Sequence, residues 1–111
     1  IIILGHSECG GIQYALNKFL DPNYRKDLEN INVWTKSFEN ILKKISNNNI
    51  DKNHLNILEQ ENIKLSITNL NNFLDTTKLN DFNISIHGLW HNIRNGSLYE
   101  FNKTKNDFIE I

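Results

Sequence analysis

The first eleven residues constrain the fold of this chain more than any other stretch. They read Ile-Ile-Ile-Leu-Gly-His-Ser-Glu-Cys-Gly-Gly, an aliphatic run that ends at a His, the only Cys of the chain and two glycines. Four consecutive aliphatic residues before a Gly are typical of a strand that is buried on both faces, as in the centre of a parallel sheet. Functional groups in such sheets lie at the carboxyl ends of the strands. We therefore expect Ile1 to Leu4 to form a central strand that leads into a functional turn.

His6 and Cys9 lie at that carboxyl end, and both carry side chains that bind metals. Their separation of three residues allows a turn to direct an imidazole nitrogen and a sulfur at one point. Zn²⁺ accepts both kinds of ligand in a tetrahedral shell, and a catalytic zinc needs about three protein ligands and one open position. The pair therefore predicts a zinc site whose third protein ligand comes from elsewhere.

Gly10 and Gly11 follow the Cys directly. Because glycine lacks a Cβ, the backbone at these positions can approach a metal ion or a small substrate closely. We predict that both are substrate-binding residues in the opening turn of a helix. The amide groups and the dipole of such a helix would favour the thiolate form of Cys9.

Residues 5–11, Gly-His-Ser-Glu-Cys-Gly-Gly, resemble the G-H-S-x-C-G-G segment of β-class carbonic anhydrases. Residues 61–70, 86–90 and 95–98 are similar to a later helix, a strand and a hairpin of the same family, and they occur in the same order. The resemblance implies a Cys₂His zinc site in which His6 and Cys9 are two of the ligands. It also implies reversible hydration of carbon dioxide to bicarbonate, and a homodimer or higher oligomer with its sites close to the subunit interface.

The chain departs from the family in one important respect. The family's first zinc Cys, and the Asp and Arg that follow it in a C-x-D-S-R segment, have no counterpart in this sequence, so the catalytic residues stay unassigned. The chain also begins inside a predicted strand and contains no Met. We therefore expect residues 1–111 to be a single β-carbonic-anhydrase-like domain truncated at its N-terminus, with little or no activity alone.

Two other interpretations remain open at this point. The chain could be a catalytically inactive remnant of the same fold that keeps part of a metal site and binds zinc weakly or not at all. Alternatively, Cys9 at a helix N-terminus could be a nucleophilic or redox-active thiol. Zinc content separates the carbonic anhydrase interpretation from both alternatives.

The composition excludes several partners. With 12 basic and 13 acidic residues, the formal net charge of -1 provides no electrostatic field for nucleic acid or for an anionic membrane. A single Cys excludes an intramolecular disulfide and favours a reducing compartment, so we predict a cytoplasmic location. There is neither an apolar run of about 18 residues nor a signal peptide, and we expect no membrane span.

The periodicity of apolar residues predicts the remaining elements. We expect a helix over 12–20 that ends at Asp21-Pro22, a helix over 34–45 followed by a break over 46–49, and a long helix over 52–74 with Asp51 as its N-cap. A polar loop over 75–81, a strand over 84–89 and a two-residue hairpin turn at Asn95-Gly96 complete the pattern. This order predicts an α/β fold, in which a parallel sheet core is flanked by helices and extended by a C-terminal antiparallel hairpin strand; the domain would be incomplete.

Overall fold

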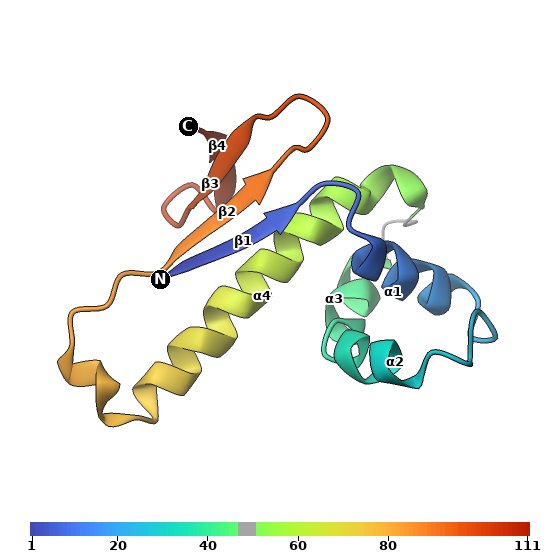
Figure 1. The fold of residues 1–111 in the computed structure, drawn as a ribbon, viewed down its shortest axis with the longest axis horizontal. Coiled ribbons are helices and arrows are strands. Elements are labelled where there is room, and N and C mark those ends of the chain that lie inside the picture. The colour runs from blue at the N-terminus through green and yellow to red at the C-terminus, as the bar shows by residue number, and fades with distance from the viewer. Residues whose placement is uncertain (47–50) are drawn as a thin grey trace.

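The computed structural model describes residues 1–46 and 51–111, and within these ranges the chain is a mixed α/β structure (Figure 1). Two elements are short 3₁₀ helices, labelled η1 and η2. The elements in chain order are β1 (Ile2–His6), α1 (Gly10–Leu20), α2 (Glu29–Lys36), α3 (Glu39–Ser46), η1 (Lys52–His54), α4 (Leu55–Asp75), η2 (Lys78–Asp81), β2 (His87–His91), β3 (Leu98–Asn102) and β4 (Asp107–Glu110).

The strands form one sheet in the order β1-β2-β3-β4. β1 and β2 are parallel, in register from Ile2 opposite His87 to His6 opposite His91, whereas β3 and β4 each pair antiparallel with the preceding strand. The predicted α/β class is therefore confirmed, with parallel pairing across the helices and an antiparallel C-terminal extension. Strand β4 was not predicted from the sequence.

Strand β1 is the edge of this sheet rather than its centre. Within the described part of the chain β1 pairs only with β2, and the side chains of Ile2 and Leu4 are 65% and 63% exposed. The prediction of a strand buried on both faces is therefore wrong for these residues. Helix α4 covers only the face that carries Ile3 and Gly5, so an aliphatic run that reads as fully buried is half covered.

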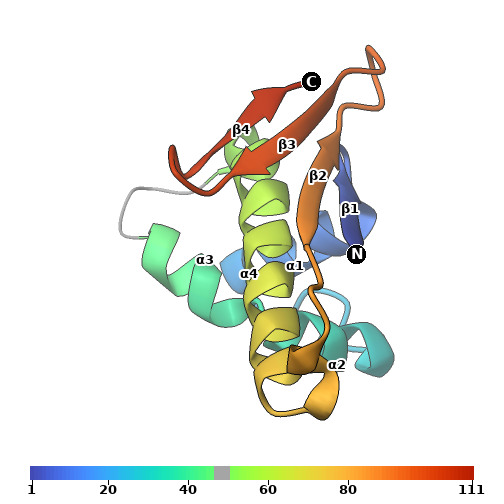
Figure 2. The same cartoon turned by 90° about the vertical axis from the view of Figure 1, so that its left-hand side faces the viewer.

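Helix α4 runs along one face of the sheet, and two glycines allow it to approach closely (Figure 2). A Cβ built on Gly5 would lie 2.7 Å from Cδ1 of Ile63, and a Cβ on Gly88 would lie 2.8 Å from Cγ2 of the same side chain and 2.6 Å from Cδ1 of Ile67. We call Gly5 and Gly88 the glycine groove. Because Ile63 is 1% exposed, this groove determines how closely the helix packs on β1 and β2.

The buried side chains form two clusters, and α4 contributes to both. The helical cluster joins α1, α3 and the start of α4, whereas the sheet cluster joins the middle of α4 to the strands. Leu58 belongs to the helical cluster and Ile63 to the sheet cluster. Helix α4 is therefore the element that fixes the helices α1 to α3 relative to the sheet. The members of the helical cluster are Ile12, Ala15, Leu16, Phe38, Leu42 and Leu58, and those of the sheet cluster are Ile63, Trp90 and Phe108.

The predicted helix over 34–45 is instead two helices, α2 and α3, which meet at Ser37 and Phe38. The Phe38 N–H donates to the Thr35 carbonyl at 2.9 Å, and the Phe38 side chain enters the helical cluster with 2% exposure. Trp34 stays 53% exposed, so the two aromatic residues do not share one buried stripe. The predicted break over 46–49 lies mostly outside the described residues.

The predicted long helix is confirmed, with its first turn formed by η1. Asp51 caps it as expected: its carboxylate accepts the Asn53 N–H at 2.8 Å and lies 2.9 Å from His54 Nδ1. The hydrogen bond from the Asn53 backbone is the largest cause that lowers the pKa of Asp51 below its ordinary value. After α4, the predicted polar loop over 75–81 contains η2.

The C-terminal strands differ in detail from the prediction. The strand expected over 84–89 begins three residues later, at His87, and residues 92–97 rather than a two-residue turn connect β2 to β3. The Asn92 N–H donates to the Ser97 carbonyl at 2.9 Å, and the Gly96 N–H donates to the Asn92 carbonyl at 2.8 Å. Gly96, with φ of 78°, occupies the left-handed conformation that glycine accepts readily.

Candidate metal centre

Residues His6 to Cys9, which we call the ligand turn, connect β1 to α1. The turn is fastened to the end of β2 by the buried Ser7: its N–H donates to the His91 carbonyl at 2.8 Å, and its Oγ accepts the Ile93 N–H at 3.0 Å. Glu8 adopts φ of 59°, a left-handed conformation that is uncommon for residues other than glycine. The fold therefore holds a tightly bent turn at the carboxyl end of a parallel strand, where the sequence placed it.

The imidazole of His6 is oriented by the backbone of its own turn. Its Nδ1 lies 2.8 Å from the carbonyl oxygen of Ser7. Because a carbonyl oxygen can only accept, Nδ1 carries the proton in this contact, which leaves Nε2 with a free lone pair. Metal-binding histidines generally use one nitrogen for the metal and donate the other N–H to a fixed acceptor. His6 is exposed and meets this condition.

Cys9 is the N-cap residue of α1 and is held through its main chain. Its carbonyl accepts the Gln13 N–H at 2.9 Å, and its own N–H donates to Oε1 of Glu59 at 3.1 Å. The side chain is half-buried and packs against the helical cluster. The sulfur of Cys9 is thus carried on a backbone that is held on both sides, at the point where the ligand turn enters α1.

The side chains of His6 and Cys9 are of the kinds that bind zinc, but they are fewer than a zinc site needs. An imidazole nitrogen and a thiolate are both ligands that zinc accepts. Across residues 1–46 and 51–111, however, no group of three or more His, Cys, Asp or Glu side chains is placed to hold a metal ion. His6 and Cys9 are thus two predicted ligands, and the described structure places no third beside them. Their convergence on one metal position stays a prediction.

The two glycines after Cys9 have different surroundings. A Cβ on Gly10 would meet no atom within 4 Å, whereas a Cβ on Gly11 would lie 2.6 Å from Cζ3 of Trp34. Gly11 therefore makes room for α2 to pack on the first turn of α1. The predicted role of both glycines in substrate binding stays a prediction, and Gly10 is the one with open space beside it.

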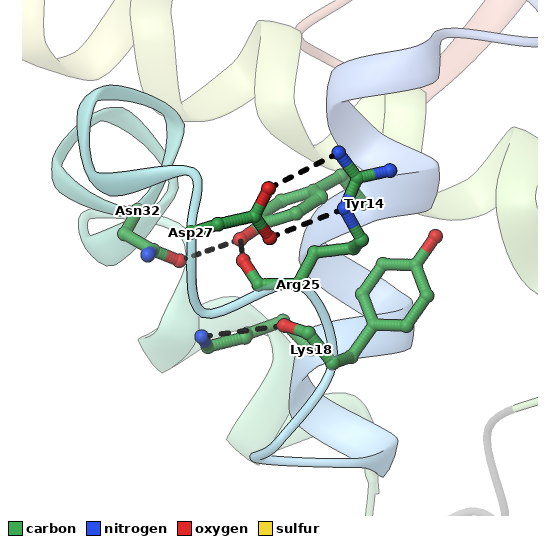
Figure 3. Close-up of polar contacts among 6 residues, drawn as sticks. Tyr14, Lys18, Arg25, Asp27 and Asn32 are labelled. Atoms are coloured by element: carbon green, nitrogen blue, oxygen red, sulfur yellow. Dashed lines mark hydrogen bonds and ion pairs between the residues drawn. The ribbon is translucent and has the colours of Figure 1, made fainter.

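Two arginines could serve an anionic substrate, and both are paired with carboxylates. Arg94, in the β2–β3 connection, forms an ion pair with Glu8 of the ligand turn. Arg25 pairs with Asp27 at 3.2 Å in the turn between α1 and α2 (Figure 3), which raises the pKa of Arg25 and lowers that of Asp27. Only the Arg94 pair lies beside the predicted metal ligands.

The Arg25 turn has a structural role. The Tyr14 hydroxyl lies 2.8 Å from Oδ1 of Asn32 and 3.0 Å from the Arg25 carbonyl oxygen, and its single proton can serve one of these acceptors at a time (Figure 3). Lys18 Nζ also donates to the Tyr24 carbonyl at 3.4 Å. These contacts fasten the turn to α1 and to α2.

A cavity of about 280 Å³ lies next to the ligand turn. It is formed by the turn, the start of the long helix and the β2–β3 connection, and its lining is mostly polar. The lining residues are Ser7, Glu8, Asn53, Leu55, Asn56, Asn92 and Arg94. The cavity brings together segments from the beginning, middle and end of the sequence, although neither predicted metal ligand is part of its lining.

Comparison with known proteins decides the family. Residues 1–98 match the protein-family model described as carbonic anhydrase, which is most of the chain. The chain belongs to the carbonic anhydrase family. The predicted resemblance to this family is thereby confirmed. A comparison with curated protein sequences finds no match.

The fold agrees with that of a solved carbonic anhydrase. The structure of the β-carbonic anhydrase CcaA superposes with a TM-score of 0.76 at 22% sequence identity, and the match covers the whole of this chain. It covers 50% of the CcaA chain, so this family member spans half the length of that structure. None of the helices in the described part of the chain combines the length and the hydropathy that a membrane span requires.

Glu59 of this family member is not among the site residues predicted from the sequence, although it contacts the predicted metal ligand Cys9. Glu59 is 2% exposed, and its second oxygen accepts the Trp90 Nε1–H at 3.1 Å. The sequence did contain a signal. Glu59 follows Leu55 by four residues and precedes Ile63 by four, so it lies on the apolar stripe of α4. A carboxylate on such a stripe needs buried partners.

Proposed function

We propose that this chain takes part in zinc-dependent reversible hydration of carbon dioxide, with His6 and Cys9 as two of the zinc ligands. Membership of the carbonic anhydrase family is the observation that supports this most directly. The ligand turn supports it as well, since it places an oriented imidazole and an N-cap thiol at the end of a parallel strand. Bound zinc supplies a water of lowered pKa, which makes hydration possible near neutral pH.

The residues of the chain have distinct parts in this proposal. His6 donates Nδ1–H to the Ser7 carbonyl and so presents Nε2 as a ligand. Cys9 offers a sulfur ligand from the N-cap of α1. Gly10 leaves space in which carbon dioxide or bicarbonate approaches the backbone. The reducing cytoplasm is the compartment that keeps this single thiol available, and we propose it as the location.

We expect residues 1–111 alone to show little or no hydration activity, because a catalytic zinc needs about three protein ligands. His6 and Cys9 are only two proposed ligands, and the described residues hold no group of three or more side chains that could bind a metal ion. Stopped-flow hydration of carbon dioxide, with bound zinc measured on the same sample, tests this. The protein isolated from its natural source should hydrate carbon dioxide and should lose that activity on treatment with a zinc chelator. Absence of both zinc and activity in that preparation would refute the proposed function and favour an inactive remnant.

We further propose that the chain associates through the open side of β1. Ile2 and Leu4 project from an edge strand and are more than half exposed, and an unpaired edge readily adds another strand. Sedimentation velocity of residues 1–111 should therefore show dimers or larger species over micromolar concentrations. Replacing Leu4 by Lys should shift the distribution to monomer, whereas the same change at the exposed Val33 of α2 should not. A monomer at every concentration would contradict the proposal.

A further inference from the structure

Glu59 is the buried carboxylate in the described core, and it lies where the two hydrophobic clusters meet. It is 2% exposed and stands on α4 directly after Leu58 of the helical cluster and one turn before Ile63 of the sheet cluster. Burying a carboxylate costs free energy unless its oxygens are hydrogen-bonded, so the partners of Glu59 must offset this cost. The partners of its two oxygens indicate what Glu59 does in the fold.

Each carboxylate oxygen of Glu59 accepts one hydrogen bond from a different element. Oε1 accepts the backbone N–H of Cys9 at 3.1 Å, and Oε2 accepts the side-chain Nε1–H of Trp90 at 3.1 Å. Both partners are uncharged donors, which suits the acceptor-only chemistry of an ionised carboxylate. One side chain thus ties α4 to the N-cap of α1 and to strand β2.

The hydrogen bond from the Cys9 N–H to Glu59 fixes the backbone that carries the thiol. The Cys9 carbonyl is already engaged by the Gln13 N–H, so with Glu59 both main-chain polar groups of this residue are held. With φ of -66° and ψ of 114°, Cys9 has an extended backbone conformation and connects the ligand turn to helix α1. The direction of its Cα–Cβ bond depends on these angles, and metal sites tolerate only small errors in ligand direction.

We propose that Glu59 is a positioning residue for Cys9, which holds the thiol in its metal-binding direction through the Cys9 N–H and braces this contact against β2 through Trp90. For its metal part this inference rests on the proposed function, whereas the positioning of Cys9 does not. Hydrogen-bond partners behind metal ligands typically change metal affinity by about 10- to 100-fold when they are removed.

Three variants and one control separate positioning from a general contribution to stability. Glu59→Met keeps the length of the side chain and removes both acceptors. Glu59→Gln keeps one acceptor oxygen. If that oxygen faces the Cys9 N–H, the hydrogen bond is weaker because the charge-assisted bond is lost, and if the amide NH₂ faces Cys9, the hydrogen bond is absent. Trp90→Phe removes the other partner of the same carboxylate and leaves the Cys9 contact in place. Glu61→Gln, which removes a charge that pairs with Lys64 near the surface, controls for the change in net charge.

Two measurements are made on each variant. Titration with cobalt(II), whose thiolate absorption band reports a bond to sulfur, gives the affinity of the Cys9 site. Amide hydrogen exchange by NMR gives the protection of the Cys9 N–H relative to the slowest amides of α4, and it needs no metal. Cys9 is the only Cys in the chain, so the thiolate band has one source.

We expect Glu59→Met to lower cobalt affinity at least ~tenfold and Glu59→Gln to lower it by less, each with faster exchange at Cys9 than at α4. Trp90→Phe, which removes the brace and leaves the Cys9 contact, should lower affinity by less than Glu59→Met does, and Glu61→Gln should change it less than about threefold. The inference is overturned if the loss of cobalt affinity is proportional to the loss of stability across all variants. It is also overturned if both Glu59 variants bind cobalt as tightly as the unaltered chain. If the unaltered chain shows no thiolate band, the two predicted ligands do not hold cobalt without a third, while the proposed zinc function is tested separately on the protein from its natural source. Cys9 exchange in Glu59→Gln then decides the inference: faster local exchange supports positioning, and unchanged exchange overturns it.

Discussion

Replacing Gly88 or Gly5 by Ala is expected to destabilise the chain by about 1 to 3 kcal/mol, the usual cost of adding an atom to a packed core. At each position the new Cβ would lie under 3 Å from the side chains of Ile63 or Ile67, and Ile63 is buried too deeply to move aside freely. Alanine is otherwise favoured over glycine in a strand, so a loss of stability would come from the clash alone. Urea denaturation followed by tryptophan fluorescence measures the free energy of unfolding.

Gly10→Ala is the matched control, because a Cβ there meets no atom within 4 Å and stands in the first turn of a helix. This change should leave stability equal or raise it by about 0.4 to 1 kcal/mol, through lower entropy of the unfolded chain. The double variant at Gly5 and Gly88 should cost less than the sum of the single changes, since one displacement of α4 relieves both clashes. Neutral single variants, or strictly additive costs, would show that α4 does not rest in the glycine groove.

Cys9→Ser is expected to lower zinc affinity by at least ~100-fold, since it would remove one of the two proposed zinc ligands, His6 and Cys9. The stability of the metal-free chain should not fall, because serine is among the best N-cap residues and Cys9 occupies the N-cap of α1. The substitution therefore separates loss of metal from loss of fold. Isothermal titration with zinc, together with thermal unfolding with and without zinc, measures both quantities.

The control for Cys9→Ser is His87→Ala, which removes an imidazole that pairs with Glu100 at 2.7 Å at the other end of the β1–β2 ladder. Zinc should raise the unfolding temperature of the unaltered chain and of His87→Ala, because a ligand that binds only the folded state stabilises it. It should not do so for Cys9→Ser. Equal zinc binding by Cys9→Ser and the unaltered chain would exclude Cys9 as a ligand and leave the reactive-thiol interpretation open.

The local features that were predicted correctly each have a strong signal in the sequence. The glycines after Cys9 and the Asp21-Pro22 pair bound α1, and Asp51 begins the long helix through a side-chain cap. The ligand turn was predicted from the junction of an aliphatic run with His and Cys. For the bounds of the two helices the deciding interaction lies within a few residues of the signal, so the local sequence is sufficient to predict them.

The features that were missed depend on residues far apart in the sequence. No Gly or Pro marks the junction of α2 and α3; the chain bends there because Phe38 enters a cluster that includes Leu58. The exposure of β1 depends on which strands and helices lie beside it, and the aliphatic run alone does not encode them. Glu59 could be recognised only as an irregularity in an apolar stripe, since its partners Cys9 and Trp90 lie 50 and 31 positions away.

The fastening of the ligand turn to β2 has a consequence for the order of events during synthesis. The turn is made before its anchors, the His91 carbonyl and the Ile93 N–H, and Ile93 lies 86 positions after Ser7 in the sequence. Closing a loop of this length costs entropy that is repaid only when β1 and β2 pair, and such distant pairings form slowly. The ligand turn therefore gains these anchors only after β2 has been made, and we expect any metal binding at His6 and Cys9 to follow that step.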